Sequence, residues 1–326
     1  MRRYIIAVIV LIFAIVFALL AGNGAIDTEN VLEVLSGGGN RAQRTIIYQV
    51  RLPRILAALS CGAALSVSGY LLQDNLNNVI ASPGLLGINN GAGLFVLLSA
   101  ILFPYQSIMK CLMAFLGALC AAVIVSILSS GTGMSKTSVI LSGVAISSLG
   151  VSLSQMIISV KPETVADKAA FSLGGFASVP WTVTRMAVPV ILILLIVAVI
   201  SAGALDLMLL GDETATGLGC NVKLYRGTHI VAASILAGAA VSMCGLIGFV
   251  GLIVPNFIRM SGGSKSRGSI LMCILAGSAF LLISDTAARL IFFPYELPCG
   301  LIMNAIGTPF LVWMLVRKRK RLGAYD

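Results

Sequence analysis

The side chains best suited to binding a charged partner are arginines near the ends of apolar segments. Arg51 and Arg54 stand three apart in the motif RLPR, and Pro53 between them suits the first turn of a helix. Both side chains can therefore project from one face of a helix end. Arg289 lies near the end of a later apolar segment, four residues after Asp285, with which it can pair. This pattern favours binding to an acidic partner or an anionic solute; the alternative is contact with lipid headgroups by snorkelling.

Residues for catalysis or metal binding form no pattern of this kind. His229 is the only histidine, and the seven cysteines are scattered without a CxxC pair, which favours small core residues over a metal or redox site. The segment GTGMSKT, residues 131–137, lacks the glycine spacing of a phosphate-binding loop. The sequence therefore predicts a chain that is not an enzyme and that has no catalytic, cofactor or metal site of its own.

A polar island, residues 205–226, separates two long apolar runs and is long enough to fold. Asp212 is predicted to be a helix N-cap, with Glu213 in the first turn, where a negative charge suits the helix dipole. Gly219 is predicted to end this helix, and Asn221 to cap a second short helix.

Within the island, Ala215 and Leu218 stand three residues apart and are expected on one helix face. The island is therefore interpreted as a compact helical knob on one side of a membrane. The alternative is a longer linker with a frayed turn.

Composition places the chain in a membrane. Of its 326 residues 58% are hydrophobic and 10% are charged, and the mean hydropathy is +1.03. The apolar runs are continuous rather than alternating, which favours helices over a β-barrel. The predicted fold class is an all-α polytopic membrane protein, a single transmembrane domain over residues 1–326. Ten spans are expected, at 4–21, 54–76, 84–103, 107–128, 137–159, 186–203, 227–246, 248–261, 268–290 and 299–316.

Two of these spans have irregular starts. The third opens with SPGLLGINNGAG, residues 82–93, and the eighth opens with GLIGFVGLIVP, residues 245–255. Irregular backbone at membrane depth must be buried in protein or line a cavity, so these breaks suggest a translocation path. Close helix packing through the same glycines is the alternative, and both can hold together.

The distribution of basic residues predicts the orientation. With both termini inside, thirteen of the 22 Lys and Arg residues fall in the cytoplasm, including the run at 317–321 in the basic tail 317–326. The knob is then cytoplasmic. The net charge of +10 predicts weak contact with anionic lipid and needs no nucleic-acid partner.

Several long motifs resemble one family. RLPRILAALSCGAALSVSGYLLQDNLNNVIASPGLLGINNGAG, LGDETATGLGCNV, GLIGFVGLIVPNFIR and SDTAARLIFFPYELPCGLIMNAIGTPFLVWML are similar to segments of the iron-chelate and cobalamin ABC-importer permeases, the FecCD family. The similarity runs from about Val50 to Val316. It implies the type II ABC-importer permease fold of ten helices, working as a dimer with itself or with a paralogue.

The resemblance also implies partners. Two ABC ATPase subunits, which bind the ATP and Mg, would lie below the permeases, and an extracytoplasmic solute-binding protein would dock above. Arg51, Arg54 and Arg289 match the docking arginines of the family. Lys136, Thr137 and Ser138 would form the inner gate of the path, at the start of the fifth span. The ATPase coupling loop would comprise Leu210, Gly211, Asp212, Glu213, Ala215, Leu218 and Gly219.

The expected function is therefore that of a permease subunit in a bacterial inner or plasma membrane, which translocates a ferric siderophore delivered by the binding protein. Haem and cobalamin are alternative substrates, and a secondary transporter is the alternative from a different class. Asn256 stands where the family usually has histidine, and Lys136 is larger than the hydroxyl residues of some members.

Overall fold

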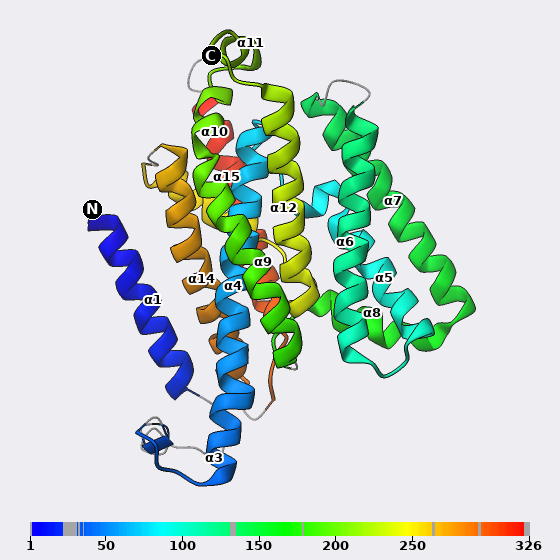
Figure 1. Ribbon diagram of the computed structural model, residues 1–326, viewed down its shortest axis with the longest axis vertical. Coiled ribbons are helices and arrows are strands. Elements are labelled where there is room, and N and C mark those ends of the chain that lie inside the picture. Colours follow the sequence, from blue (N-terminus) through cyan, green and yellow to red (C-terminus); the bar gives the residue numbers. More distant parts are fainter. Residues whose placement is uncertain are drawn as a thin grey trace.

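The computed structural model describes residues 2–21, 31, 33–34, 36–130, 135–177, 179–262, 265–292 and 295–322. Regular structure in these ranges is entirely helical, as expected (Figure 1). The last four residues of the predicted basic tail, 323–326, lie outside the described residues.

Ten apolar helices coincide in order with the ten expected spans. Seven are long and apolar enough to cross a membrane, whereas α5, α13 and the apolar part of α15 are shorter. The sixth and seventh helices begin five residues earlier than predicted, because polar residues at their starts continue the helix. The ten are α1 (Arg2–Leu20), α4 (Leu52–Asn75), α5 (Ile88–Leu102), α6 (Ser107–Ser130), α7 (Lys136–Val160), α9 (Trp181–Ile200), α12 (Val222–Cys244), α13 (Val250–Met260), α14 (Ser266–Leu290) and α15 (Cys299–Leu322).

Shorter helices join these spans. At one end α3 (Arg41–Thr45) and the π-helix η1 (Ile46–Arg51) lead directly into α4, and η3 (Pro162–Thr164) and α8 (Val165–Leu173) follow α7. The 3₁₀ helix η2 (Pro83–Leu86) precedes α5. At the opposite end lie α10 (Ala202–Met208) and α11 (Asp212–Gly217). The end that carries α11 is called the knob end below, and the end that carries α3 is called the far end (Figure 1).

Helix α4 forms the centre of the molecule, and 83% of the residues in its most apolar stretch are buried. Glycines bring it against two neighbours: a Cβ at Gly62 would overlap the Gly277 carbonyl of α14, and a Cβ at Gly69 would overlap the Gly251 carbonyl of α13. The Ser68 hydroxyl donates to the Ala233 carbonyl of α12 at 2.6 Å. Small residues and hydroxyl groups thus hold the core together, as is usual where lipid supplies no hydrophobic driving force between helices.

Both predicted breaks in helical structure are present. The first is η2 and Gly87, whose φ of +75° requires a left-handed conformation. The second covers residues 245–249 and ends at Phe249, with φ +67°. Two of its amides bond to protein, because Gly245 donates to the Val241 carbonyl and Leu246 donates to the Phe171 carbonyl of α8, each at 2.9 Å. Irregular backbone and close packing therefore occur together at these breaks.

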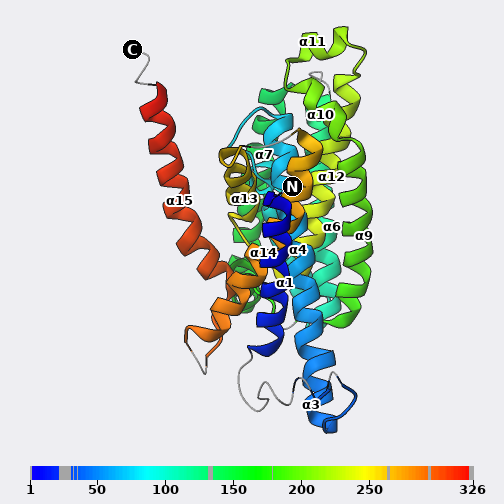
Figure 2. The ribbon, with the colours of Figure 1, turned by 90° about the vertical axis from the view of Figure 1, so that its left-hand side faces the viewer.

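Helices α1, α7 and α15 lie at the periphery of the molecule, and 11% of the most apolar stretch of α1 is buried. Only 17% of the most apolar stretch of α7 is buried. Helix α15 leans away from the other helices toward its C-terminal end (Figure 2). The N-terminal residues of α1 contact the knob end, since Arg3 donates to the Gly262 carbonyl and Tyr4 to the Gly268 carbonyl. Arg3 therefore lies at the same end as the knob, in agreement with the prediction that the N-terminal basic residues and the knob share one side of the membrane.

Candidate functional site

The knob is a folded structure and not a frayed linker. It comprises α10, α11 and the connecting residues 209–211 and 218–221, and it extends past the ends of the long helices (Figures 1 and 2). Ala215 of α11 is fully buried and forms a small apolar core with Ala204, Met208, Cys220 and Val222. This core explains why a short helix is stable here, since an isolated helix of six residues is not.

The prediction that Asp212 is the N-cap is wrong. Gly211, with φ +107°, occupies that position, and Asp212 is the first residue of α11. The Asp212 carboxylate instead accepts hydrogen bonds from Arg226 of α12 at 2.7 and 2.9 Å. A charge-assisted bond to a guanidinium is stronger than a bond to a backbone amide, which explains the difference. This ion pair ties the knob to the start of a long span.

The Arg226 hydrogen bond also changes the acidity of Asp212. It holds the pKa of Asp212 below its ordinary value, against the opposing effect of partial burial, and the charge of Lys136, 4.0 Å away, acts in the same direction. Asp212 is therefore ionised at neutral pH and links α11, α12 and the first residue of α7.

The other predictions for the knob have mixed outcomes. Gly219 follows the last turn with φ +84°, as a helix stop should. Asn221 does cap a helix, accepting from the Leu224 amide at 3.1 Å, but that helix is the long span α12 and not a short one. Ala215 and Leu218 do not share a face, because α11 ends at Gly217 and Leu218 is 60% exposed.

Exposed apolar side chains lie on the outside of the knob. Leu210 is 61% exposed and Leu218 is 60% exposed, and Glu213 of α11 is also exposed. Apolar side chains that gather on a segment outside the long spans mark a surface that a partner can cover.

At the far end, charged residues from distant segments form one cluster. Arg54 of α4 donates to both carboxylate oxygens of Asp285 on α14, each at 2.9 Å, and to Glu296 at 2.8 Å. The predicted pairing of Asp285 with Arg289 is present, with 3.6 Å between Nε and Oδ2. The sequence places Glu296 on the outer side, but its ion pair with Arg54 was not predicted.

The three predicted docking arginines are brought together but are turned inward. Arg51 is 5% exposed, Arg54 8% and Arg289 5%. Arg51 donates to the Leu19 carbonyl of α1 at 2.6 Å, and Arg289 lies 3.3 Å from the Ala21 carbonyl. In this conformation they hold α1, α4 and α14 together, and their binding to a partner stays a prediction.

Helix α7 begins at the knob end with the residues predicted to form the inner gate. Lys136 is its first residue, and the Ser135 hydroxyl caps it by accepting from the Ser138 amide at 3.2 Å. Thr137 is exposed. Further along the same helix, polar side chains on one exposed face follow helical spacing: Ser148, Ser152, Gln155 and Ser159. Polar groups on a spanning helix favour contact with protein or a water-filled path over contact with lipid.

A further polar link near the knob end was missed from the sequence. Arg259 of α13 binds Asp74 of α4 at 2.6 Å and Gln73 at 2.5 Å, and its guanidinium lies over the Tyr70 ring. Asn256 donates to the carbonyl of Val79 at 3.0 Å. Asn256 therefore joins α13 to the turn after α4 by a hydrogen bond that an amide can make without ionising.

Among the described residues, no group of three or more His, Cys, Asp or Glu side chains is arranged to hold a metal ion. All seven cysteines are free thiols. The structure thus has a cluster of charged residues at the far end and an exposed apolar surface at the knob end. Closely packed spans connect the two ends.

Comparison with known proteins gives consistent results. The model of the FecCD transport family matches residues 10–317. The chain is 35% identical to the Fe(3+)-citrate import system permease protein YfmD of Bacillus subtilis, over 99% of this chain and 96% of that protein. It is 33% identical to the hemin transport system permease protein HmuU of Yersinia pestis, over 95% of each.

A solved structure agrees with the fold. It is described as an inward-facing conformation of a metal-chelate type ABC transporter, and it superposes with a TM-score of 0.84 at 25% identity, covering 95% of this chain and 97% of that one. With a family match over nearly its whole length and relatives above 30% identity, the chain belongs to the FecCD transport family.

Proposed function

We propose that this chain is the membrane-spanning permease subunit of an ABC importer and that it translocates a ferric siderophore. The observation that carries the proposal is the knob, a folded segment beyond the spans with Leu210 and Leu218 exposed on its outside. An apolar surface of this kind fits a cleft on an ATPase subunit. The Asp212–Arg226 ion pair and the buried core around Ala215 would pass movement of that subunit to α12.

The remaining features fit this assignment. The exposed polar face of α7 suits the lining of a path formed with a second permease, identical or paralogous, with Lys136, Thr137 and Ser138 at its inner gate. The knob end would be cytoplasmic, with both termini, because predicted cytoplasmic cations such as Lys223 and Arg226 lie there. The far-end arginine cluster would receive an acidic solute-binding protein.

The names of the relatives support the substrate class. Their names include ferric citrate, ferric enterobactin, ferric hydroxamate and hemin permeases, and a vitamin B12 permease of Vibrio cholerae is 33% identical over 84% of this chain. Iron chelates are the most frequent among them, which favours a ferric siderophore over haem or cobalamin.

The proposal is tested by uptake into proteoliposomes that contain this chain, its ATPase and its binding protein. We expect ATP-dependent accumulation of a radiolabelled ferric siderophore, and no accumulation of hemin or cobalamin. Accumulation of hemin or cobalamin alone would contradict the substrate assignment. Uptake that needs a proton gradient and no ATP would contradict the importer assignment and favour a secondary transporter.

A further inference from the structure

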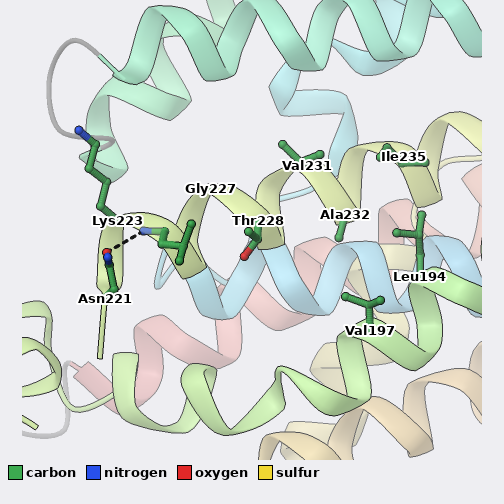
Figure 3. Close-up of a pocket in the computed structure, with 10 residues that line it drawn as sticks. Leu194, Val197, Asn221, Lys223, Gly227, Thr228, Val231, Ala232 and Ile235 are labelled. Atoms are coloured by element: carbon green, nitrogen blue, oxygen red, sulfur yellow. Dashed lines mark hydrogen bonds between the residues drawn. The ribbon is translucent and has the colours of Figure 1, made fainter. Parts of the chain in front are cut away.

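A groove of about 630 Å³ runs along the outside of the bundle between α9 and α12 (Figure 3). It begins just below the knob and lies beside exposed apolar side chains of α9, among them Ile193 and Ile196, which are 61% and 59% exposed. It therefore opens toward the bilayer, and the described residues of its lining include none from α7, the helix proposed to line the path. Its lining residues are Leu194, Val197, Asn221, Lys223, Leu224, Gly227, Thr228, Val231, Ala232 and Ile235.

The lining has two chemical zones. Leu194 and Val197 of α9, together with Val231, Ala232 and Ile235 of α12, make one part of the lining entirely apolar (Figure 3). The end nearest the knob is polar and carries Lys223, the single charged side chain among the described residues of the lining.

At the polar end of the groove, hydrogen bonds within the protein fix the orientation of the Asn221 and Thr228 side chains. The Asn221 side-chain oxygen accepts from the Leu224 amide, so its NH₂ group is the part that can donate to a ligand (Figure 3). The Thr228 hydroxyl donates to the Tyr225 carbonyl at 3.0 Å, so its oxygen is available as an acceptor. A positive charge and an amide donor at one end of an apolar groove match an anionic headgroup joined to a hydrocarbon chain.

The dimensions agree with one lipid leaflet. Lys223 and Ile235 are twelve residues apart on one helix, which corresponds to roughly 18 Å along its axis. Half of a hydrocarbon core is about 15 Å thick. A headgroup at Lys223 would therefore place an acyl chain along Val231 and Ile235 without leaving the leaflet on the knob side.

We propose that this groove binds one anionic phospholipid, with its phosphate at Lys223 and one acyl chain between α9 and α12. The lipid would bridge the helix that leads into the knob and the helix that leads out of it, because α9 continues into α10 and α12 follows residue 221. Its effect is to hold these two helices at a fixed separation. The proposal depends on insertion in a membrane and is independent of what the protein transports.

The test uses the full chain purified in a mild detergent and examined by native mass spectrometry and thermal unfolding with added lipid. The probes are phosphatidylglycerol and phosphatidylethanolamine with identical acyl chains. We expect one molecule of phosphatidylglycerol to be retained, and Lys223→Gln to lower its retention by about 5-fold, the effect of one basic residue near a membrane surface. Arg267→Gln is the matched control, because Arg267 is exposed at the same end but does not line the groove.

Two bulky substitutions on opposite walls, Val197→Trp and Val231→Trp, test the acyl-chain part. Either substitution should fill the groove and abolish both the retention of phosphatidylglycerol and the increase in Tm that this lipid gives. Two variants are used so that the test still works if one of them fails to fold. Inorganic phosphate alone should give no increase. Equal retention of the two lipids, equal loss in Arg267→Gln and Lys223→Gln, or unchanged retention in folded Trp variants would overturn the proposal.

Discussion

Arg54 on α4 and Asp285 on α14 are 231 residues apart in the chain and form a two-point ion pair, with both N–O distances at 2.9 Å. Both side chains are buried, and the same carboxylate lies 3.6 Å from Arg289. The arginines expected to meet an external partner are thus already neutralised in part by the protein itself. The far end therefore has a structural role in addition to any role in docking.

The first prediction concerns this pair. Asp285→Ala removes two of the three carboxylate hydrogen bonds of buried Arg54 and the ion pair of Arg289, and leaves Arg54 only its bond to Glu296. It should therefore lower the free energy of unfolding by about 3–5 kcal/mol. The double variant Arg54→Met with Asp285→Leu should recover part of the loss, since a buried ion pair can be replaced by apolar side chains. Thermal unfolding in detergent measures both, with Arg41→Gln on exposed α3 as the control. An Asp285→Ala variant as stable as the control would refute a structural role.

The second prediction separates docking from folding. Glu296 binds Arg54 through one nitrogen and its side chain is 35% exposed, whereas Asp285 holds the other two nitrogens. Glu296→Gln should therefore keep the fold and remove one negative charge from the rim. Affinity for an acidic binding protein should increase by up to about 5-fold at low salt and by less at high salt. Unchanged affinity at low salt would argue against docking at this cluster.

A third prediction addresses the knob surface. Glu213→Arg and Leu218→Asp should abolish coupled uptake, because each changes an exposed side chain on the outside of the knob. Membrane insertion and unfolding temperature should be unchanged, because neither side chain belongs to the core around Ala215. Uptake assays together with ATPase binding provide the measurement. Normal uptake in both variants would exclude the knob as the coupling element.

The fourth prediction uses two glycines of the same segment. Gly219 has φ +84°, whereas Gly217 has an ordinary helical conformation, and at both positions a Cβ would meet no atom within 4 Å. Gly219→Ala should therefore destabilise the knob by about 1–2 kcal/mol, the cost of a left-handed alanine. Gly217→Ala should be neutral or slightly stabilising. Limited proteolysis of the knob distinguishes them, and equal protection would contradict the turn geometry.

A fifth prediction concerns pH. The pKa of Asp212 is lower in the folded protein than in the unfolded chain, where it is about 3.9. The ion pair with Arg226 therefore contributes its full stability at pH values above about 3.9. This contribution is lost as the pH falls through the folded-state pKa. Protection of the knob from proteolysis should accordingly be constant between about pH 5 and 8. Asp212→Asn should reduce protection across that whole window. A knob that loosens between pH 6 and 8 in the unchanged protein would contradict the assignment.

The sequence predicted the spans well because each depends on a long local run of apolar residues, and the breaks because glycine and proline act locally. Asn221 and Gly219 were recognised for the same reason. Asp212 was misassigned because its partner, Arg226, lies in the next helix. The Arg54–Glu296 and Arg259–Asp74 ion pairs were missed because they depend on which spans are neighbours, and periodicity does not encode that.

Native mass spectrometry of this chain co-expressed with a partner ABC ATPase shows directly whether the knob binds that subunit. We expect a complex of two permease chains and two ATPase subunits, which loses the ATPase when Glu213→Arg or Leu218→Asp is introduced. A stable particle without ATPase that still transports in liposomes without ATP would contradict this expectation.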